Sequence, residues 1–378
     1  MIETVPWWMW IVGFLLVLGP LVTVHELGHY LVGRWFGVKA DAFSVGFGKE
    51  LAGWTDKRGT RWKLSVLPLG GYVQFAGDMN PASQPSEEWL ALPAEERART
   101  FQAQPLWQRA LIVAAGPVTN VLVAIAIFTA FNLAYGKPVP ADPAKESVIA
   151  GFAELSPARE AGFRIGDRIV AVEGERLATF REVQSAIFLR PNERITVTVV
   201  RGGRTLALPV TTRSEEMQDR FGNVSAIGLI GVEGRETERR FEPVGVGEAV
   251  VLAGEQTVQT VDMMITGIAQ IISGRRSVEE LGGPIKIAKF SGEQLSLGWQ
   301  EFVWFAAMIS LNLAFINLLP IPALDGGHLA FYAAEAVRRK PAGPRSQEWA
   351  FRTGVALVLA LMLFVTINDV ASLKLFGG

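Results

Sequence analysis

Long apolar stretches alternate with polar segments along this chain of 378 residues. A hydrocarbon core of ~30 Å takes about 20 helical residues to cross. The second and third apolar stretches are each longer than 20 residues and carry no formal charge, whereas the fourth is shorter. The pattern predicts a polytopic α-helical membrane protein with four transmembrane helices, at Trp7–Tyr30, Ala110–Gly136, Phe302–Leu324 and Thr353–Asn368.

Residues 41–76 have the pattern of β-strands. Apolar side chains occupy alternate positions on both sides of a turn-like segment at 55–59. The alternating residues are Phe43, Val45, Phe47, Trp62, Leu64 and Val66. A hairpin that follows the first span directly lies near the membrane surface. It is either a small structural hairpin or an edge strand that pairs with an extended peptide. Residues 80–104 are polar and proline-rich, which favours a solvated loop with a short surface helix.

Residues 145–213 predict a compact β-rich module. A strand at 169–172 and a helical stretch around 180–188 precede two strands joined by Gly202-Gly203, a typical hairpin turn. The spacing of Ser-Pro-Ala, Ala-Gly and Gly-Asp-Arg-Ile within 156–169 resembles the PDZ domains of bacterial membrane and periplasmic proteases. Such domains bind peptide tails by adding a strand. The alternative is a module that only restricts access sterically.

Residues 244–296 show helical apolar periodicity interrupted by Glu255 and Asp262. These charges disfavour a fifth crossing, so the sequence predicts an amphipathic helix that lies on the membrane surface.

Basic residues cluster on one side of the predicted membrane. Segments before Trp7 and after Asn368 contain almost none, whereas the two segments that follow spans one and three contain many. The basic residues of the segment after span one are Arg34, Lys39, Lys49, Lys57, Arg58, Arg61 and Lys63, and those of the segment after span three are Arg338, Arg339, Lys340 and Arg345. The positive-inside rule therefore predicts that both termini and the β-rich module are extracytoplasmic.

The overall composition disfavours nucleic-acid binding and excludes cysteine chemistry. The formal net charge is −1 and no basic run is interleaved with aromatic residues, so nothing indicates nucleic-acid binding. The chain has no cysteine, which excludes disulfides, thiolate metal ligands and a cysteine nucleophile.

Two of the three histidines lie four positions apart at the end of the first span. At helical spacing His25 and His29 share one face, so that both imidazoles can bind one Zn²⁺ while Glu26 addresses a bound water. A zinc-protease motif in an apolar segment indicates a protease whose substrate is itself in the membrane.

Catalytic zinc takes three protein ligands, so a third must come from elsewhere. His328 is one candidate and Asp325 is the other. Asp325 follows Pro320 and Pro322, which break the third span, and a carboxylate at an apolar boundary is costly unless it is paired or metal-bound. The cytoplasmic ends of spans one and three reach the same leaflet. At 1.5 Å per residue, His25 and Asp325 lie at depths that agree within one or two helical turns.

Several motifs together resemble the site-2 protease family, and its bacterial RseP-like branch in particular. They are His-Glu-Leu-Gly-His at 25–29, Asn-Leu-Leu-Pro-Ile-Pro-Ala-Leu-Asp-Gly-Gly at 317–327, the segments 101–120 and 281–289, and the outward PDZ-like insert. The match covers nearly the whole chain. The best-studied members of that branch carry two tandem PDZ domains, whereas this chain has room for one.

The resemblance implies roles for five residues. His25, His29 and Asp325 are the expected zinc ligands, Glu26 is the expected general base, and Asn317 is expected to hold the substrate backbone near the scissile bond. It also implies that the 41–76 hairpin is a membrane-associated β element. In the implied mechanism Zn²⁺ acidifies its water and Glu26 accepts the proton and passes it to the leaving amine. The substrate helix must unwind locally before it is cut.

The expected organisation combines four membrane helices with the β hairpin and an extracytoplasmic PDZ-like domain. Its parts are 1–40 (first transmembrane helix), 41–104 (hairpin and loop), 105–137 (second transmembrane helix), 145–235 (PDZ-like domain), 240–298 (amphipathic helical linker), 300–328 (third transmembrane helix) and 350–374 (fourth transmembrane helix).

The resemblance implies a zinc intramembrane endopeptidase of a bacterial inner membrane. Its expected substrates are single-span membrane proteins already trimmed outside, such as anti-sigma factors, and leftover signal peptides. One alternative is a membrane-anchored zinc protease of membrane-protein quality control, which would want a glutamate as third ligand. The other is a non-catalytic adaptor that binds peptide tails, which the presence of Glu26 disfavours.

Overall fold

The computed structural model describes residues 5–77, 93–140, 147–177, 179–218, 224–234, 239–274, 278, 282–340 and 343–372. Parts of the predicted 80–104 loop, the start of the predicted 145–235 domain and the end of the predicted 350–374 helix lie outside this set. The chain divides into two compact units. The helical unit comprises residues 5–129, 253–261 and 281–378, and the β-rich unit comprises residues 130–252 and 262–280.

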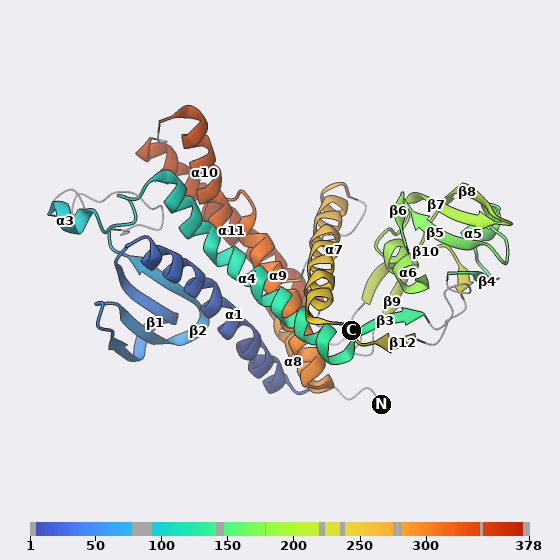
Figure 1. Ribbon diagram of the computed structural model, residues 1–378, viewed down its shortest axis with the longest axis horizontal. Helices are drawn as coiled ribbons and strands as arrows, with labels where there is room; N and C mark the ends of the chain where they lie inside the picture. The colour runs from blue at the N-terminus through green and yellow to red at the C-terminus, as the bar shows by residue number, and fades with distance from the viewer. Residues whose placement is uncertain are drawn as a thin grey trace. The chain divides into compact units, whose positions relative to one another are not determined.

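Four helices in the described part of the chain are long and apolar enough to cross a membrane (Figure 1). They are α1 (Trp7–Trp35), α4 (Leu106–Tyr135), α9 (Trp299–Leu318) and α11 (Pro344–Ser372). All four lie where the apolar stretches predict spans. α9 ends earlier than the predicted Leu324, because Pro320 lacks the N–H that would continue the helix.

A glycine turn at the end of α1 leads the chain directly into a sheet. Gly37 has φ +83°, a conformation that favours glycine. Its N–H donates to the carbonyl of Arg34 (3.1 Å), and the N–H of Val38 donates to the carbonyl of Gly33 (2.9 Å). These two bonds form a Schellman motif. Strand β1 (Ala40–Thr55) begins two residues later, so the sheet lies against the last turns of α1.

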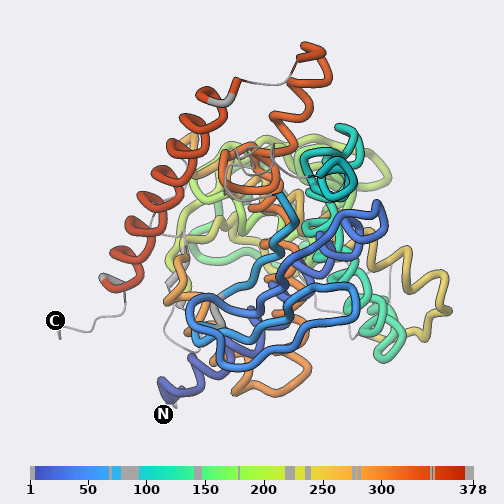
Figure 2. Tube along the Cα trace, turned by 90° about the vertical axis from the view of Figure 1, so that its left-hand side faces the viewer, coloured from blue at the N-terminus to red at the C-terminus, as the bar shows by residue number. Residues whose placement is uncertain are grey.

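Strands β1 and β2 (Arg61–Phe75) fold back on themselves and form more than a simple hairpin. Residues 40–45 of β1 pair with 71–75 of β2 on one side and with 61–64 on the other, while 50–55 also pair with 61–65. The strands can be followed in Figure 2 as the blue segments in front. Residues 71–75 therefore form an edge of the described sheet.

The turn between the two strands is built around Asp56. Its Oδ1 accepts hydrogen bonds from the N–H groups of Arg58 (2.8 Å) and Thr60 (3.0 Å), and its Oδ2 accepts one from the Trp62 indole (3.1 Å). The bond from the Trp62 indole holds the pKa of the half-buried Asp56 carboxyl below its ordinary value. The Tyr30 hydroxyl of α1 also donates to Asp56 Oδ2 (3.5 Å), so the turn is tied to the helix as well as to both strands.

Aromatic side chains pack the sheet against the helices. Tyr30 of α1 contacts Phe43 and Trp62 edge to face, and the ring of Phe75 stacks on Phe101. Burial of such rings is a large stabilising contribution. The buried core of this region consists of Tyr30, Val38, Ala40, Phe43, Phe75, Phe101, Ile112, Val113 and Tyr332.

The helical unit also contains α3 (Ala94–Arg97), α8 (Pro284–Leu297) and α10 (Asp325–Arg338), and α7 (Val246–Ile272) is divided between the two units. The predicted 240–298 linker thus contains two separate helices. α8 packs closely on α1, because Gly13 and Gly292 leave no room for a side chain between the two backbones. The buried Asp369 of α11 accepts hydrogen bonds from the N–H groups of Gly283 (3.0 Å) and Lys286 (2.9 Å) at the start of α8.

The β-rich unit contains a four-stranded antiparallel sheet and three two-stranded pairs. The sheet order is β6-β5-β7-β8, and the pairs are β3 with β12, β4 with β11 and β9 with β10. Their bounds are β3 (Lys137–Pro140), β4 (Ile149–Phe152), β5 (Arg168–Val172), β6 (Glu175–Arg176), β7 (Arg194–Arg201), β8 (Arg204–Thr211), β9 (Arg213–Gln218), β10 (Val224–Leu229), β11 (Val232–Gly234) and β12 (Arg239–Glu242). The short helices are α5 (Pro157–Glu160) and α6 (Phe180–Phe188).

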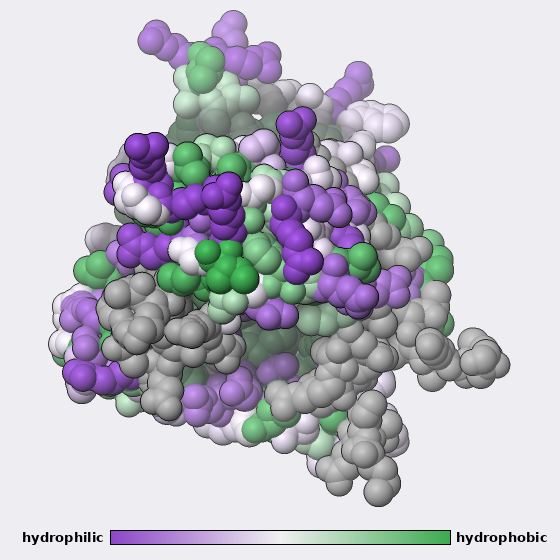
Figure 3. Space-filling view, turned by 90° about the vertical axis from the view of Figure 1, so that its right-hand side faces the viewer, coloured by the Kyte–Doolittle hydropathy of each residue, from purple (hydrophilic) through white to green (hydrophobic). Residues whose placement is uncertain are grey.

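Local sequence explains several features of this unit. The hairpin predicted at Gly202-Gly203 is confirmed, since both glycines have positive φ and join β7 to β8. α6 begins with a capping box between Thr179 and Glu182. One buried hydrophobic cluster includes Ile149, Ile169, Val183, Ile195, Val197 and Val199. Hydrophilic side chains are prominent on the face of the molecule in Figure 3, and hydrophobic ones gather near its middle.

Candidate metal centre

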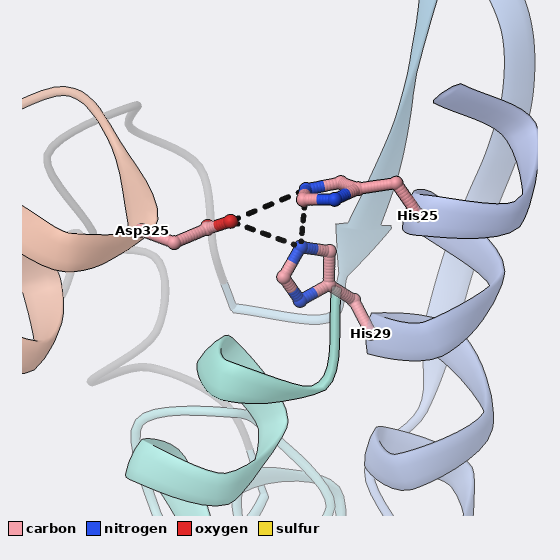
Figure 4. A group of neighbouring side chains, drawn as sticks. All are labelled: His25, His29 and Asp325. Atoms are coloured by element: carbon pink, nitrogen blue, oxygen red, sulfur yellow. Dashed lines mark hydrogen bonds and ion pairs between the residues drawn. The ribbon is translucent and has the colours of Figure 1, made fainter. Parts of the chain in front are cut away.

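His25 and His29 lie on one face of α1, one turn apart (Figure 4). Their rings meet edge to face with centroids 4.8 Å apart, and their Nε2 atoms are separated by 3.2 Å. His25 is buried, with 7% of its surface exposed. The spacing of four residues on a helix produces this convergence, as the sequence predicts.

The two rings have room because α4 approaches α1 at glycines. A Cβ on Gly28 would meet the backbone of Ala115 and the side chain of Thr119. A Cβ on Gly116 would collide with His29 Nε2 and would lie 2.8 Å from His25 Cε1. The imidazoles therefore occupy the space that a side chain at position 116 would take.

Asp325 reaches the same point from the other end of the chain. After α9 ends at Leu318, the chain turns through Pro320, Pro322 and Ala323, the last with φ +96°. Asp325 is the first residue of α10. Its Oδ2 lies 3.2 Å from His25 Nε2 and 3.6 Å from His29 Nε2. In Figure 4 the carboxylate points between the two rings.

The three side chains fit a tetrahedral metal ion. With metal–ligand bonds of ~2.0–2.1 Å, two ligand atoms of a tetrahedral zinc lie about 3.3–3.4 Å apart. The three separations observed here, 3.2, 3.2 and 3.6 Å, bracket that value. Among the described residues, the histidine and carboxylate side chains that can share one ion are His25, His29 and Asp325.

The position of the proton on the His29 ring also favours a metal ion at this site. His29 Nδ1 lies 2.8 Å from the carbonyl oxygen of Ile112, which can only accept a hydrogen bond, so Nδ1 carries the proton of the neutral ring. Nε2 then presents a lone pair to Asp325 Oδ2, a buried oxygen to which no described group donates a hydrogen bond. Acceptors that converge in a buried space are stabilised by a cation between them.

Glu26 lies on the same turn of α1 and is held by the sheet. Its Oε2 accepts a hydrogen bond of 3.2 Å from the backbone N–H of Val73 in β2. Val73 pairs with Phe43 of β1. Because the N–H of Val73 donates to Glu26, it points away from β1 and outward from the edge of the sheet. The carboxylate of Glu26 is therefore attached to the 71–75 edge strand, beside the histidine pair of the same helix.

Two predicted residues lie outside the ligand cluster. His328, the alternative third ligand, is on α10 and is not part of the cluster found among the described residues. Asn317 is half-buried on the last turn of α9. Its contact with substrate stays a prediction.

Three residues that contact His29, Glu26 and His25 were not predicted from the sequence. Ile112 and Val73 contribute backbone groups, which carry no side-chain signal. Asn120 of α4 lies 3.3 Å from His25 Nδ1. The available signal for Asn120 was its polar side chain within an apolar span, since such residues face the interior of a helix bundle and are frequently functional.

Comparison with known proteins agrees with the donor set. Residues 13–361 match peptidase family M50. A relative from Agrobacterium fabrum, named as a zinc metalloprotease, is 46% identical over 367 residues, which cover 96% of each chain. A second relative with such a name, from Rhizobium meliloti, is 46% identical over 360 residues, or 94% of this chain and 95% of the relative.

A third relative is more distant and equally complete. The metalloprotease MmpA of Caulobacter vibrioides is 37% identical over 393 aligned positions, which cover 97% of this chain and 96% of MmpA. The family match spans most of the chain, and the relatives match it from end to end. This chain therefore belongs to peptidase family M50, the site-2 protease family, and is a zinc metalloprotease whose described residues include four helices long and apolar enough to cross a membrane.

Proposed function

We propose that this protein is an intramembrane endopeptidase, which cleaves transmembrane segments of single-span membrane proteins. The observation that carries the proposal is that two of the three proposed zinc ligands, His25 and His29, lie on an apolar helix of 29 residues. His25 is preceded by 18 residues of α1, or about 27 Å of helix at 1.5 Å per residue. A substrate that reaches these ligands enters the depth of the bilayer.

The charge pattern supports an active site near the cytoplasmic face of a bacterial inner membrane. Basic residues follow the ends of α1 and α10, and few lie beyond the other ends of the spans. His25 and Asp325 both belong to the basic side. In this orientation both termini and the β-rich unit are extracytoplasmic.

The catalytic work of the chain centres on Glu26. Zinc, when bound to His25, His29 and Asp325, supplies Lewis acidity toward a water and toward the scissile carbonyl. Glu26 accepts a proton from that water and donates it to the leaving amine. Its link to Val73 keeps the carboxylate beside the sheet edge and limits the positions from which it acts.

The edge formed by residues 71–75 supports a mode of substrate binding. An intact transmembrane helix hides its carbonyls in hydrogen bonds, so the segment to be cut must unwind. The unwound segment adds as a strand to residues 71–75, whose outward backbone groups replace the lost hydrogen bonds. Asn317, at the end of α9, holds the substrate backbone on the other side of the scissile bond.

The β-rich unit supports a role as a filter. Its four-stranded sheet and the capped helix α6 are compatible with a PDZ-like domain that binds a peptide tail. A sheet of this size also restricts access by bulk alone. Either role favours substrates whose extracytoplasmic part has already been removed, such as anti-sigma factors in regulated intramembrane proteolysis, and leftover signal peptides.

The test uses the full chain reconstituted in liposomes with a single-span substrate. We expect cuts inside the transmembrane segment, mapped by mass spectrometry of the products, and none with Asp325→Ala. A matched substrate with the same cleavage sequence in a soluble unfolded protein should be cut far more slowly. Preference for the soluble substrate would favour a membrane-anchored quality-control protease. No cleavage of either substrate, with peptide tails bound, would favour an adaptor.

A further inference from the structure

The ring of His25 faces a side chain that has no assigned role. Its Nδ1 lies 3.3 Å from the amide of Asn120, on α4. Asn120 is fully buried at 0% exposed, and its Oδ1 has no hydrogen-bond partner among the described residues. A buried amide with an unpaired oxygen beside a proposed zinc ligand calls for a physical explanation.

Metal binding by His25 would explain the unpaired oxygen of Asn120. A neutral imidazole that binds a metal through Nε2 carries its proton on Nδ1, so that Nδ1 is a donor. The amide must then present an acceptor, which is Oδ1. A half-turn of the amide exchanges Oδ1 and Nδ2, and places the unpaired oxygen opposite the Nδ1–H group.

Asn120 is held in place by a second helix. Ser310 of α9 donates a hydrogen bond of 2.8 Å to the backbone carbonyl of Asn120, and Ser310 is itself fully buried. On the same helix α4, the carbonyl oxygen of Ile112 accepts a hydrogen bond from His29 Nδ1 at 2.8 Å. One helix thus presents one acceptor to each histidine.

We propose that Asn120 is a positioning residue of the metal centre: its Oδ1 accepts a hydrogen bond from His25 Nδ1–H and so directs Nε2 toward the ion. Such a partner fixes the tautomer and the orientation of the ring and makes it a stronger ligand. The inference rests on the proposed role of His25 as a zinc ligand. It assigns to α4 a part in metal binding although that helix supplies no ligand.

The test compares zinc affinities of full-length variants by competition with a chelator. We expect Asn120→Ala to weaken zinc binding about 10- to 100-fold, the usual effect of removing such a partner. Asn120→Asp keeps the acceptor and should bind zinc within about threefold of the parent, or more tightly. This rescue separates the role of an acceptor from general packing, because Asp cannot donate as Nδ2 does.

A control lies on the same helix. Asn132 is also buried and donates to a backbone carbonyl, that of Ala249 at 3.3 Å, away from the histidines. Asn132→Ala should leave zinc affinity unchanged. If Asn120→Ala does not fold, as judged by thermal unfolding, the nearly isosteric Asn120→Leu serves in its place.

Two results overturn the inference. One is parental affinity in Asn120→Ala or Asn120→Leu, and the other is an Asn120→Asp variant as weak as Asn120→Ala. His25→Ala distinguishes these results from failure of the ligand assignment. If His25→Ala still binds one zinc per chain at parental affinity, the proposed ligand set is wrong, whatever Asn120 does.

Discussion

Glu26 Oε2 and the backbone N–H of Val73 are joined by a hydrogen bond of 3.2 Å. The bond connects the proposed general base with the edge of the sheet that we propose as the substrate's docking strand. The proposed base and the proposed docking strand are thus coupled through one backbone group.

Val73→Pro tests this link. Proline removes the N–H, and an edge strand tolerates it where the N–H points away from the ladder. A hydrogen bond to a charged group contributes about 1.5–3 kcal/mol. We therefore expect kcat to fall about 10- to 100-fold. Zinc content should stay the same. Val73→Ala, which keeps the N–H, is the control. Equal turnover in the two variants would remove Val73 from the mechanism.

Glu26→Gln separates metal binding from proton transfer. Glutamine keeps the size of the side chain and cannot accept the proton, so turnover should fall by about 10²–10⁴-fold. Because Glu26 is not in the ligand cluster, metal analysis should still find one zinc per chain. Unchanged turnover would rule out this base.

Gly116→Ala tests the close approach of α4 to the histidines. The added Cβ would collide with His29 Nε2, so the rings must move and zinc binding should weaken about tenfold or more, measured by chelator competition. Gly19→Ala is the matched control, since no other atom lies within 4 Å of a Cβ built at that position of α1. Parental affinity in Gly116→Ala would show that the rings have room to spare.

The β-rich domain that we propose as a filter can be deleted between two paired strands. β3 and β12 pair antiparallel, with Pro140 opposite Arg239, so a short turn can replace residues 141–238 and leave the flanking strands paired. The shortened protein should cut substrates that still carry an extracytoplasmic domain, while its rate on trimmed substrates should change little. Loss of all cutting in a correctly folded, zinc-loaded protein would argue against a filter.

The β-rich unit should lose stability in acid through Asp167. Burial disfavours the charged form of this side chain. Even so, hydrogen bonds from Arg201 (2.7 Å) and from the N–H of Arg164 (2.9 Å) hold the pKa of Asp167 below its usual value. A depressed pKa adds stability above the unfolded value of about 3.9. That stability is lost as pH falls through the folded pKa.

Hydrogen exchange of residues 164–169 in the full chain measures this loss. Protection should fall as the pH drops below about 4. Asp167→Asn should show weaker protection at neutral pH and a flatter dependence on pH. The same dependence in both proteins would mean that another group is responsible.

The membrane helices and the histidine pair were accessible from sequence for simple physical reasons. Charge-free runs of sufficient length have few alternatives to a membrane helix, and a spacing of four on a helix fixes one face. Asp325 required a topological argument, because nothing local connects it with His25. The depth of each residue along its helix indicated that they meet, and the distance of 3.2 Å between His25 Nε2 and Asp325 Oδ2 agrees with it.

The sheet was harder to foresee. Period-two alternation gives the faces of a strand and says nothing about which strands become neighbours. β1 and β2 bend, with Gly46 and Gly48 at positive φ, and residues 71–75 thereby reach the other side of 40–45. The edge near Glu26 arises from this bend. Asn120 was overlooked for a different reason, since an amide side chain in an apolar helix has several structural uses.

The positions of the three proposed zinc ligands along the chain have a thermodynamic consequence. His25 and His29 belong to the first helix, whereas Asp325 follows about 300 residues later. One ion shared between them acts as a crosslink that closes a very long loop, and the entropy of loop closure grows only slowly with such length. Metal occupancy is thereby coupled to the mutual packing of the first and last thirds of the polypeptide. Chelation should loosen the whole bundle as well as stop catalysis.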